Sequence, residues 1–389
     1  MNFAKRTYLD YNATTPLAPS VLEAMSSHRW SFGNPSSVHT EGKRSRRGIN
    51  EVRDFLYDTF SLNEEAFDLV FHSGATEGMN TIVKALALEA FKEKKQFTFL
   101  FCESDHSCIV NQKGFLETLG FKAITYGINK DGSVNEQELE NKIKNHCDGE
   151  LLVNWTWVNN ESGVVFPFSI IEKLKEKYKL QLMVDGVQAI GKIKDWMVLS
   201  LALDYITFSG HKFGALKGSG FSFIRNSGQV LALLNGGGQQ GGYRSGTENS
   251  YGVFSLKLAL ETLNENYDFS SQNSAVRLFE EKLKNLLGNE GEIVGLENPH
   301  RNGNTIYFIL YNHPAQTTAM AFDMGGIDLS NGSACSSGAV VPSRVLLGMG
   351  HGEKEAKAGL RLSFSPFVNE EEVLEIWEKF HPILNRFIS

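Results

Sequence analysis

The sequence predicts an α/β fold, with a large domain built on a mostly parallel sheet and a smaller α+β domain. Short apolar runs alternate with stretches of helical period through the middle of the chain, an order typical of parallel strands joined by helices. After residue 248 the alternation ends, and longer helices mix with isolated strands. The length of 389 residues agrees with this division, because it is about two to three times that of a typical domain.

The elements of both regions can be placed by their periodicity. In the first region, strands are predicted at residues 68–72, 97–101, 121–126, 151–157, 180–184 and 205–208. The helices between them are predicted most clearly at residues 76–91 and 169–179. In the second region, helices are predicted at residues 251–265, 274–287, 316–324 and 369–387, and strands at 304–310 and 359–363.

The composition excludes several classes of function. The chain has 38 Lys and Arg residues against 45 Asp and Glu, a net charge of −7. A protein that binds nucleic acid or an anionic membrane through its overall charge is normally basic, so this composition does not indicate either partner. No apolar run approaches the roughly 18 residues that a membrane helix needs. The first ten residues lack the apolar core of a signal peptide, so we expect a cytoplasmic protein.

The cysteines form no recognisable framework. Cys102, Cys108, Cys147 and Cys335 include no Cys-x-x-Cys pair, so the sequence predicts neither a disulfide scaffold nor a zinc site of that type. Because no disulfides are predicted, we expect the protein to function in a reducing compartment.

The segment SGATEG, residues 73–78, follows a predicted strand and opens a predicted helix. Gly74 permits a sharp turn and Thr76 is a suitable N-cap residue. The free N–H groups and the dipole at the start of a helix favour an anion such as a phosphate. An ordinary capped turn explains the segment equally well.

Two further motifs follow predicted strands. In VDGVQ, Asp185 comes directly after the apolar run LQLMV, at the edge of the sheet where α/β proteins bind ligands, although it could also be a helix N-cap. In SGHK, Lys212 follows the strand DYITF. Among apolar walls a lysine loses proton affinity and can form an imine, whereas the simpler alternative is an exposed lysine.

Together the three motifs predict a cofactor site. SGATEG can hold a phosphate, Asp185 can pair with a pyridinium nitrogen, and Lys212 can form an imine. Pyridoxal 5′-phosphate requires all three, and a carboxylate at its ring nitrogen makes the ring an electron sink. The combination is therefore far more specific than any one motif.

Three other features point to substrate chemistry. The segment GGGQQGGYRSGTEN, residues 236–249, contains six glycines and can bring Thr247 close to a partner, or can be a flexible surface loop. Cys335 lies among small residues in NGSACSSG, so we expect a mobile loop with a reachable thiol. Arg361, between Leu360 and Leu362 on a predicted strand, can bind a carboxylate with both guanidinium nitrogens.

Eight segments of the chain occur in one order that is similar to a known family. They are YLDYNATTP (8–16), FGNPSSVH (32–39), SGATEG, VNNESGVV (158–165), VDGVQAIGK, SGHK, GGGQQGGYRSGTEN and NGSACSSG. Together they resemble the cysteine desulfurases of the class V aminotransferase family, which use pyridoxal 5′-phosphate on the aminotransferase fold type I. The resemblance spans about residues 8–363. It implies a seven-stranded sheet in a large domain at residues 15–260, and a small domain formed by residues 1–14 and 261–389.

The resemblance also implies a role for each matched residue. Lys212 is the Schiff-base lysine, Asp185 the pyridinium partner, and His106 the residue that stacks on the ring and helps to move protons. Gln188 and Asn160 resemble the residues around the 3′ oxygen of the cofactor. The remaining implied cofactor contacts, at the phosphate, are Ala75, Thr76, Ser209, His211 and, from the neighbouring subunit, Thr247.

The implied reaction converts L-cysteine to L-alanine, with the sulfur held as a persulfide on Cys335. Asn34, Asn160 and Arg361 resemble the contacts to the substrate carboxylate. The resemblance further implies a homodimer and a sulfur-acceptor protein, such as an iron–sulfur scaffold or a component of tRNA thiolation. No metal, nucleic acid or membrane is expected to take part.

Two other functions remain open at this point. A selenocysteine lyase or another class V aminotransferase-like enzyme would use the same cofactor site, but an aminotransferase has no need of a mobile thiol at Cys335. A sulfur-relay subunit without cofactor would not require Lys212, Asp185 and His106 to be intact.

Overall fold

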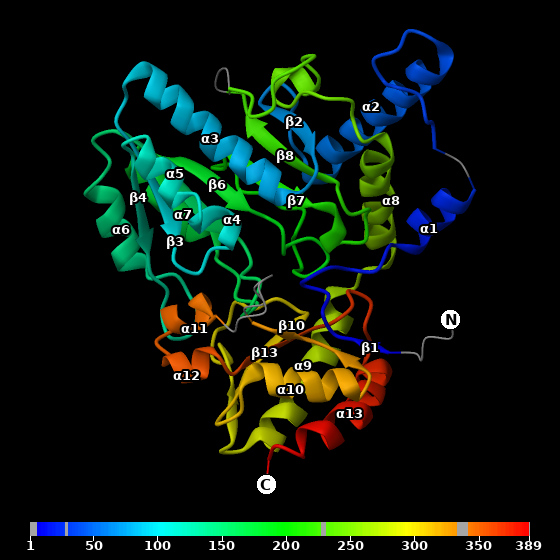
Figure 1. Cartoon of the computed structure of the whole chain (residues 1–389), viewed down its shortest axis with the longest axis vertical. Helices are drawn as coiled ribbons and strands as arrows, with labels where there is room; N and C mark the ends of the chain where they lie inside the picture. Colours follow the sequence, from blue (N-terminus) through cyan, green and yellow to red (C-terminus); the bar gives the residue numbers. More distant parts are fainter. Residues whose placement is uncertain (1–5, 28–29, 227–230, 333–340, 389) are drawn as a thin grey trace.

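The computed structural model describes residues 6–27, 30–226, 231–332 and 341–388. A large domain occupies the upper part of the view in Figure 1, and a smaller domain lies below it. The predicted fold class is confirmed, since a large, mostly parallel sheet is flanked by helices and accompanied by a smaller α+β unit.

The large sheet has seven strands in the order β2-β8-β7-β6-β5-β3-β4. Their bounds are Phe67–His72 (β2), Phe97–Cys102 (β3), Lys122–Tyr126 (β4), Glu150–Thr156 (β5), Gln181–Asp185 (β6), Tyr205–Ser209 (β7) and Gly220–Arg225 (β8). All pairs are parallel except those of β8, which runs antiparallel to both β2 and β7. The sequence prediction missed β8. Only residues 210–219 join it to β7, which is too short for a helical crossover and therefore makes the pair antiparallel.

The helices predicted at residues 76–91, 169–179 and 251–265 are present within a few residues of those ranges, and the other helices of the large domain were not predicted. The helix bounds are Pro19–Ser26 (α1), Thr40–Phe60 (α2), Ala75–Glu93 (α3), Ser107–Val110 (α4), Lys113–Thr118 (α5), Glu136–Lys144 (α6), Phe168–Lys177 (α7) and Ser250–Asn266 (α8). Two short 3₁₀ turns, Gly210–Lys212 (η1) and Gln240–Gly242 (η2), complete the set.

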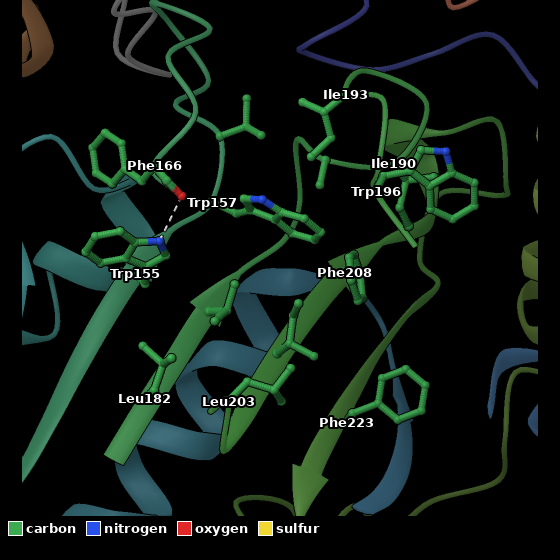
Figure 2. Packing of buried hydrophobic residues seen from close by; sticks show 14 of the residues in the cluster. Trp155, Trp157, Phe166, Leu182, Ile190, Ile193, Trp196, Leu203, Phe208 and Phe223 are labelled. Atoms are coloured by element: carbon green, nitrogen blue, oxygen red, sulfur yellow. Dashed lines mark hydrogen bonds between the residues drawn. The ribbon is translucent and has the colours of Figure 1, made fainter. Parts of the chain in front are cut away.

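Both faces of the large sheet are buried, which explains the continuous apolar runs of its strands. On β3, Phe97, Phe99 and Phe101 join the core under α3, while Leu100 and Cys102 join the core of the opposite face. Figure 2 shows part of the second core, where the indole of Trp155 also donates a hydrogen bond to the Phe166 carbonyl (3.1 Å).

The smaller domain combines a four-stranded sheet with helices. The sheet has the order β12-β13-β10-β9. The bounds are Gly291–Ile293 (β9), Thr305–Leu310 (β10), Ser330–Asn331 (β12), Gly359–Ser363 (β13), Phe269–Leu287 (α9), Ala315–Met324 (α10), Arg344–Gly348 (α11), Glu353–Ala356 (α12) and Glu370–Leu384 (α13). At the start of α13, Asn369 and Glu372 form a capping box, which satisfies N–H groups that a helix leaves unpaired.

The N-terminal segment belongs in part to the smaller domain. β1 (Thr7–Tyr8) pairs in parallel with β11 (Ile327–Asp328), and Leu9 is buried in the core of this domain. At the other boundary, Leu263 on α8 still packs in the core of the large domain. The division at residues 14/15 and 260/261 stays a prediction.

A loop after β5 brings the two domains into close contact. Gly163 has a φ of +72°, and a Cβ atom placed on it would lie 2.6 Å from the Asn302 side-chain oxygen. The carbonyl of Gly163 accepts a hydrogen bond from the Asn302 main chain (2.8 Å). Only glycine suits both this backbone conformation and this close approach.

Phe60, the last residue of α2, lies at the centre of an aromatic cluster in the large domain. Its ring centroid lies 5.0 Å from that of Phe208, 5.9 Å from Phe221, 5.7 Å from Phe223 and 6.0 Å from Trp196. These contacts pack the end of α2 against β7 and β8, the strands before and after Lys212.

We expect Phe60→Ala to lower the free energy of unfolding of the large domain by about 3–5 kcal/mol, because it leaves a cavity in a packed core. Denaturant titration followed by far-ultraviolet circular dichroism measures this change. Phe91→Ala is the matched control, since that side chain is 58% exposed, and it should change the free energy of unfolding little. Equal effects of the two substitutions would contradict this description of the core.

Candidate active site

The predicted cofactor residues gather where neighbouring parallel strands end. Asp185 is the last residue of β6 and Ser209 the last residue of β7, while His106 follows β3. Lys212 closes the 3₁₀ turn that comes directly after β7. Because the carboxyl ends of parallel strands share one edge of the sheet, the topology brings these side chains together.

Lys212 is held by the N-terminal segment. Its amino group donates hydrogen bonds to the main-chain carbonyls of Asn12 and Ala13, each at 2.7 Å. Burial, together with the positive charge of Arg361, lowers the pKa of Lys212 to about 8, against the opposing effects of Asp10 and Asp185. At pH 7 about a tenth of such an amine is neutral and nucleophilic, far more than for an ordinary lysine.

Asp185 and His106 lie on the other side of this amine. The Asp185 carboxylate is buried and accepts a hydrogen bond from the Val187 main chain (3.0 Å). Burial raises the pKa of Asp185, while the hydrogen bond and the nearby His106 and Lys212 oppose that rise. A cationic partner that faces Asp185, such as a pyridinium, would therefore stabilise its ionised form.

His106 presents a neutral imidazole. Its Nδ1 accepts a hydrogen bond from the Cys108 main chain (3.2 Å), so the neutral ring carries its proton on Nε2. The residue is exposed at this edge of the sheet, and the partial desolvation of its ring lowers the pKa of His106, with Asp185 acting in the opposite direction. The ring can thus donate or relay a proton through Nε2.

The start of α3 forms an anion site that differs from the predicted one in one detail. The N-cap residue is Gly74, with no side-chain cap, and Thr76 lies inside the first turn, so the prediction of Thr76 as N-cap is wrong. Glycine is favoured here because residue 74 has a φ of +157°, a backbone conformation that residues with a side chain rarely adopt. Within the described residues the main-chain N–H groups of Ala75 and Thr76 donate to no partner, which leaves them directed at an incoming anion.

His211 points toward the N-terminal segment. Its Nδ1 lies 3.1 Å from the Thr14 hydroxyl, and burial together with the nearby Lys212 lowers the pKa of His211 to about 4. The imidazole is therefore neutral at pH 7. It can contact a phosphate by hydrogen bonding, without contributing a positive charge.

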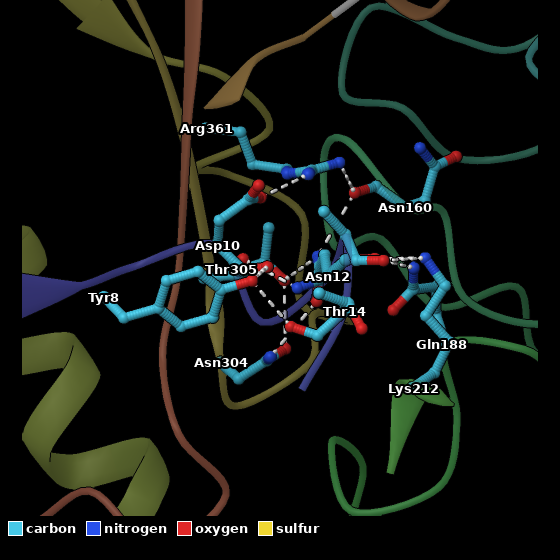
Figure 3. A network of polar contacts seen from close by, with 12 residues as sticks. Tyr8, Asp10, Asn12, Thr14, Asn160, Gln188, Lys212, Asn304, Thr305 and Arg361 are labelled. Carbon is cyan, nitrogen blue, oxygen red and sulfur yellow. Dashed lines mark hydrogen bonds and ion pairs between the residues drawn. The ribbon is translucent and has the colours of Figure 1, made fainter. Parts of the chain in front are cut away.

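Arg361 connects the smaller domain to this site, as Figure 3 shows. One terminal guanidinium nitrogen pairs with the Asp10 carboxylate (2.8 Å) and the other donates to the Asn160 carbonyl (3.0 Å). The Nε atom is buried without a partner. Arg361 thus has donor capacity left for a carboxylate ligand.

Comparison with known proteins agrees with this geometry. The family model described as "Aminotransferase class-V" matches residues 7–376. The chain belongs to the class-V aminotransferase family. Like that family, it is dependent on pyridoxal phosphate.

The relatives of this class-V chain include named cysteine desulfurases. A cysteine desulfurase IscS of Clostridium botulinum is 33% identical over 394 residues, covering 98% of this chain and 95% of the relative. A NifS-like protein from Rickettsia africae has a TM-score of 0.84 at 29% identity, covering 98% and 100% of the two chains. A structure of SspA in complex with cysteine has a TM-score of 0.78 at 27% identity, covering 93% and 99%. The predicted family and cofactor are confirmed.

The residues of this class-V chain fit pyridoxal phosphate. Lys212 supplies a partly neutral amine for the aldehyde, and Asp185 a buried carboxylate for the ring nitrogen. The first turn of α3 and the Ser209 hydroxyl supply unpaired donors for the phosphate. The Gln188 amide donates to the Asn12 carbonyl (2.9 Å), the same acceptor that Lys212 uses, so this amide lies beside the reactive amine.

Three predicted site residues are not brought to Lys212 by the described structure. Asn34 is exposed and accepts a hydrogen bond from the Ser36 main chain (2.9 Å), in the loop that precedes α2. Thr247 is exposed and makes no hydrogen bond within the described residues. Cys335 lies outside the described residues.

Sequence reasoning assigned no role to Asp10, Asn12 or Lys192, although each lies in a quoted motif. Asp10 contributes to the site through its ion pair with Arg361, and Asn12 through its main-chain carbonyl, which accepts a hydrogen bond from Lys212. The one sequence signal for Asp10 and Asn12 was their place in the motif YLDYNATTP. A main-chain carbonyl can accept a hydrogen bond in any residue type, so the sequence does not reveal such a contact. Among the described residues, no group of three or more His, Cys, Asp or Glu side chains could hold a metal ion. No described helix is both long and apolar enough to cross a bilayer.

The lowered pKa of Lys212 predicts how cofactor attachment depends on pH. Only the neutral amine attacks an aldehyde, so attachment of pyridoxal phosphate to the cofactor-free protein should accelerate as the pH rises through about 8. Stopped-flow absorbance of the lysine-bound cofactor measures the rate. Arg361→Met removes a nearby positive charge and should move the midpoint upward.

Lys212→Ala is the control for this experiment and should show no lysine-bound absorbance. A midpoint near 10.5, the ordinary value for lysine, would contradict the burial of Lys212 described above.

Proposed function

We propose that this chain is a cysteine desulfurase, which converts L-cysteine to L-alanine and transfers the sulfur through a persulfide on Cys335. The observation that carries the proposal is the cluster of Lys212, Asp185, His106 and Arg361 at one sheet edge, in a chain whose relatives are named cysteine desulfurases. The solved SspA structure that resembles this chain contains cysteine, which supports the same substrate.

The substrate carboxylate binds to Arg361, whose buried Nε has no other partner. Asp10 and the Asn160 carbonyl hold the guanidinium in place from the other side. The two terminal nitrogens are oriented by these contacts before the substrate arrives, which reduces the entropy cost of binding.

The proton at the substrate Cα passes to the Lys212 amine. Burial keeps a useful fraction of this amine neutral near pH 7, so it can act as a base. When bound, pyridoxal phosphate supplies the aldehyde that captures the substrate amine and a ring that accepts the electron pair left at Cα. Asp185 favours the protonated ring nitrogen, and His106 offers its Nε2 proton nearby.

The Cys335 thiolate then attacks the sulfur of the substrate. A bond forms between the two sulfur atoms as the bond between carbon and sulfur breaks, and the electron pair of the broken bond stays on carbon. That carbon takes up a proton and leaves as the methyl group of alanine, while Cys335 keeps the persulfide. The sulfur next passes to an acceptor in iron–sulfur cluster assembly or tRNA thiolation.

We further propose a cytoplasmic homodimer in which Thr247 completes the phosphate site of the neighbouring subunit. Thr247 is exposed and without a hydrogen bond in the described part of the chain, and the segment around it is largely exposed as well. Arg244 in the same segment pairs with Glu77 in the first turn of α3 (2.8 Å), which anchors the segment near a phosphate site.

Cys335→Ala should keep the absorbance of the lysine-bound cofactor but lose sulfide release from cysteine, because no other group is expected to accept the sulfur. Absorbance spectra with sulfide and alanine analysis measure both. Cys147→Ala, a free and partly exposed cysteine elsewhere, is the matched control and should retain activity. Undiminished sulfide release from Cys335→Ala would refute the assignment of the nucleophile.

A further inference from the structure

Lys192 is a buried lysine close to the site, with no role in the reaction described above. Its side chain is buried, and the residue as a whole is 3% exposed. Within the described residues, the one hydrogen bond of its amino group goes to the side-chain oxygen of Gln188, four residues earlier in the sequence. Its main chain is fixed as well, because its N–H donates to Ala189 (3.1 Å) and its carbonyl accepts from Gly303 (2.9 Å).

No charge compensates this lysine directly. Within the described residues, no carboxylate lies within ion-pair distance of its amino group, and burial drives the pKa of Lys192 well below its ordinary value. The charged groups that face it are Lys212, Arg361 and, with the opposite sign, Asp10. A methionine would fill the same space without the cost of desolvating an amine, so stability alone does not explain a lysine here.

The contacts of Gln188 define the orientation of its amide. The Asn12 carbonyl can only accept a hydrogen bond, so the NH₂ group of Gln188 must face it (2.9 Å). The amide oxygen then faces Lys192, which donates to it. Lys192 thus prevents a flip that would place the oxygen of Gln188 beside the Lys212 amine.

This orientation matters for the cofactor chemistry. The amine of Lys212 and the NH₂ group of Gln188 share the Asn12 carbonyl as acceptor, so they are neighbours. In pyridoxal phosphate the 3′ oxygen is on the ring carbon next to the one that bears the aldehyde. A donor beside Lys212 can therefore reach that oxygen once the cofactor is attached.

We propose that Lys192 is a positioning residue that holds the Gln188 amide with its N–H groups directed at the 3′ oxygen of the lysine-bound cofactor. The inference rests on the proposed function, since it requires the cofactor to be attached to Lys212. A hydrogen bond to the 3′ oxygen withdraws electron density from it and weakens its attraction for the proton on the nitrogen that joins Lys212 to the cofactor. The arrangement thus keeps that nitrogen easier to deprotonate.

The test is a pH titration of the absorbance of the cofactor-loaded protein, which reports the protonation of that nitrogen. Lys192→Met should raise its pKa by about half to one unit, the size expected for the loss of one hydrogen bond. Gln188→Leu should raise it as much or more. The double variant should titrate like Gln188→Leu alone, because Lys192 acts through Gln188.

Two controls accompany the titration. Lys194→Met changes an exposed lysine two residues away and should titrate like the unchanged protein. Lys192→Arg keeps a donor and should restore most of the original titration. Thermal melting of each cofactor-free variant separates a loss of folding from a change at the site, and Lys192→Leu, which also lacks a donor, replaces the methionine variant if that variant does not fold.

Each result has a distinct meaning. An unchanged titration in Lys192→Met, or additive shifts in the double variant, would overturn the positioning role while leaving the proposed function intact. Absence of lysine-bound absorbance in the unchanged protein would instead overturn the proposed function, and this inference with it.

Discussion

The site depends on one main-chain carbonyl, that of Asn12. The Lys212 amine and the Gln188 amide both donate to it, at 2.7 and 2.9 Å. The Asn12 side chain in turn donates to Thr305 in the smaller domain (2.9 Å) and to the carbonyl of Asn160 in the large one (3.1 Å). A residue that holds the reactive lysine is therefore also one of the residues that join the two domains, so a shift of one domain against the other would disturb the site.

The charges around this carbonyl form a second constraint. Lys212 and Arg361 lie in a largely buried space together with the carboxylates of Asp10 and Asp185. Burial and the positive charge of Arg361 make it costly to protonate the Lys212 amine, while Asp10 keeps Arg361 oriented. Lys212 and Arg361 together suit anionic ligands, such as the phosphate of a cofactor and the carboxylate of an amino acid.

Much of the fold could be predicted from the chain because burial on both faces of the sheet makes its strands continuous apolar runs. Six of the strands lie within a few residues of the predicted ranges, and so do α3 and α7 between them, whereas α4, α5 and α6 were not predicted. β8 was missed because its antiparallel direction follows from a short connection and not from its composition. At the start of α3, residue preference indicated Thr76 as the N-cap, whereas the N-cap is residue 74, whose φ of +157° favours glycine.

The sequence by itself determined the kind of chemistry. A carboxylate, a lysine and a glycine-bearing turn, each placed after an apolar strand, identify a cofactor site because parallel strands end at one edge. Only the tertiary structure decided how that chemistry is tuned. The carbonyl of Asn12, the ion pair of Asp10 with Arg361 and the contact of Lys192 with Gln188 join parts of the chain through backbone atoms and burial. Such contacts depend on distance in space and on the exclusion of water, which residue type and spacing along the chain do not record.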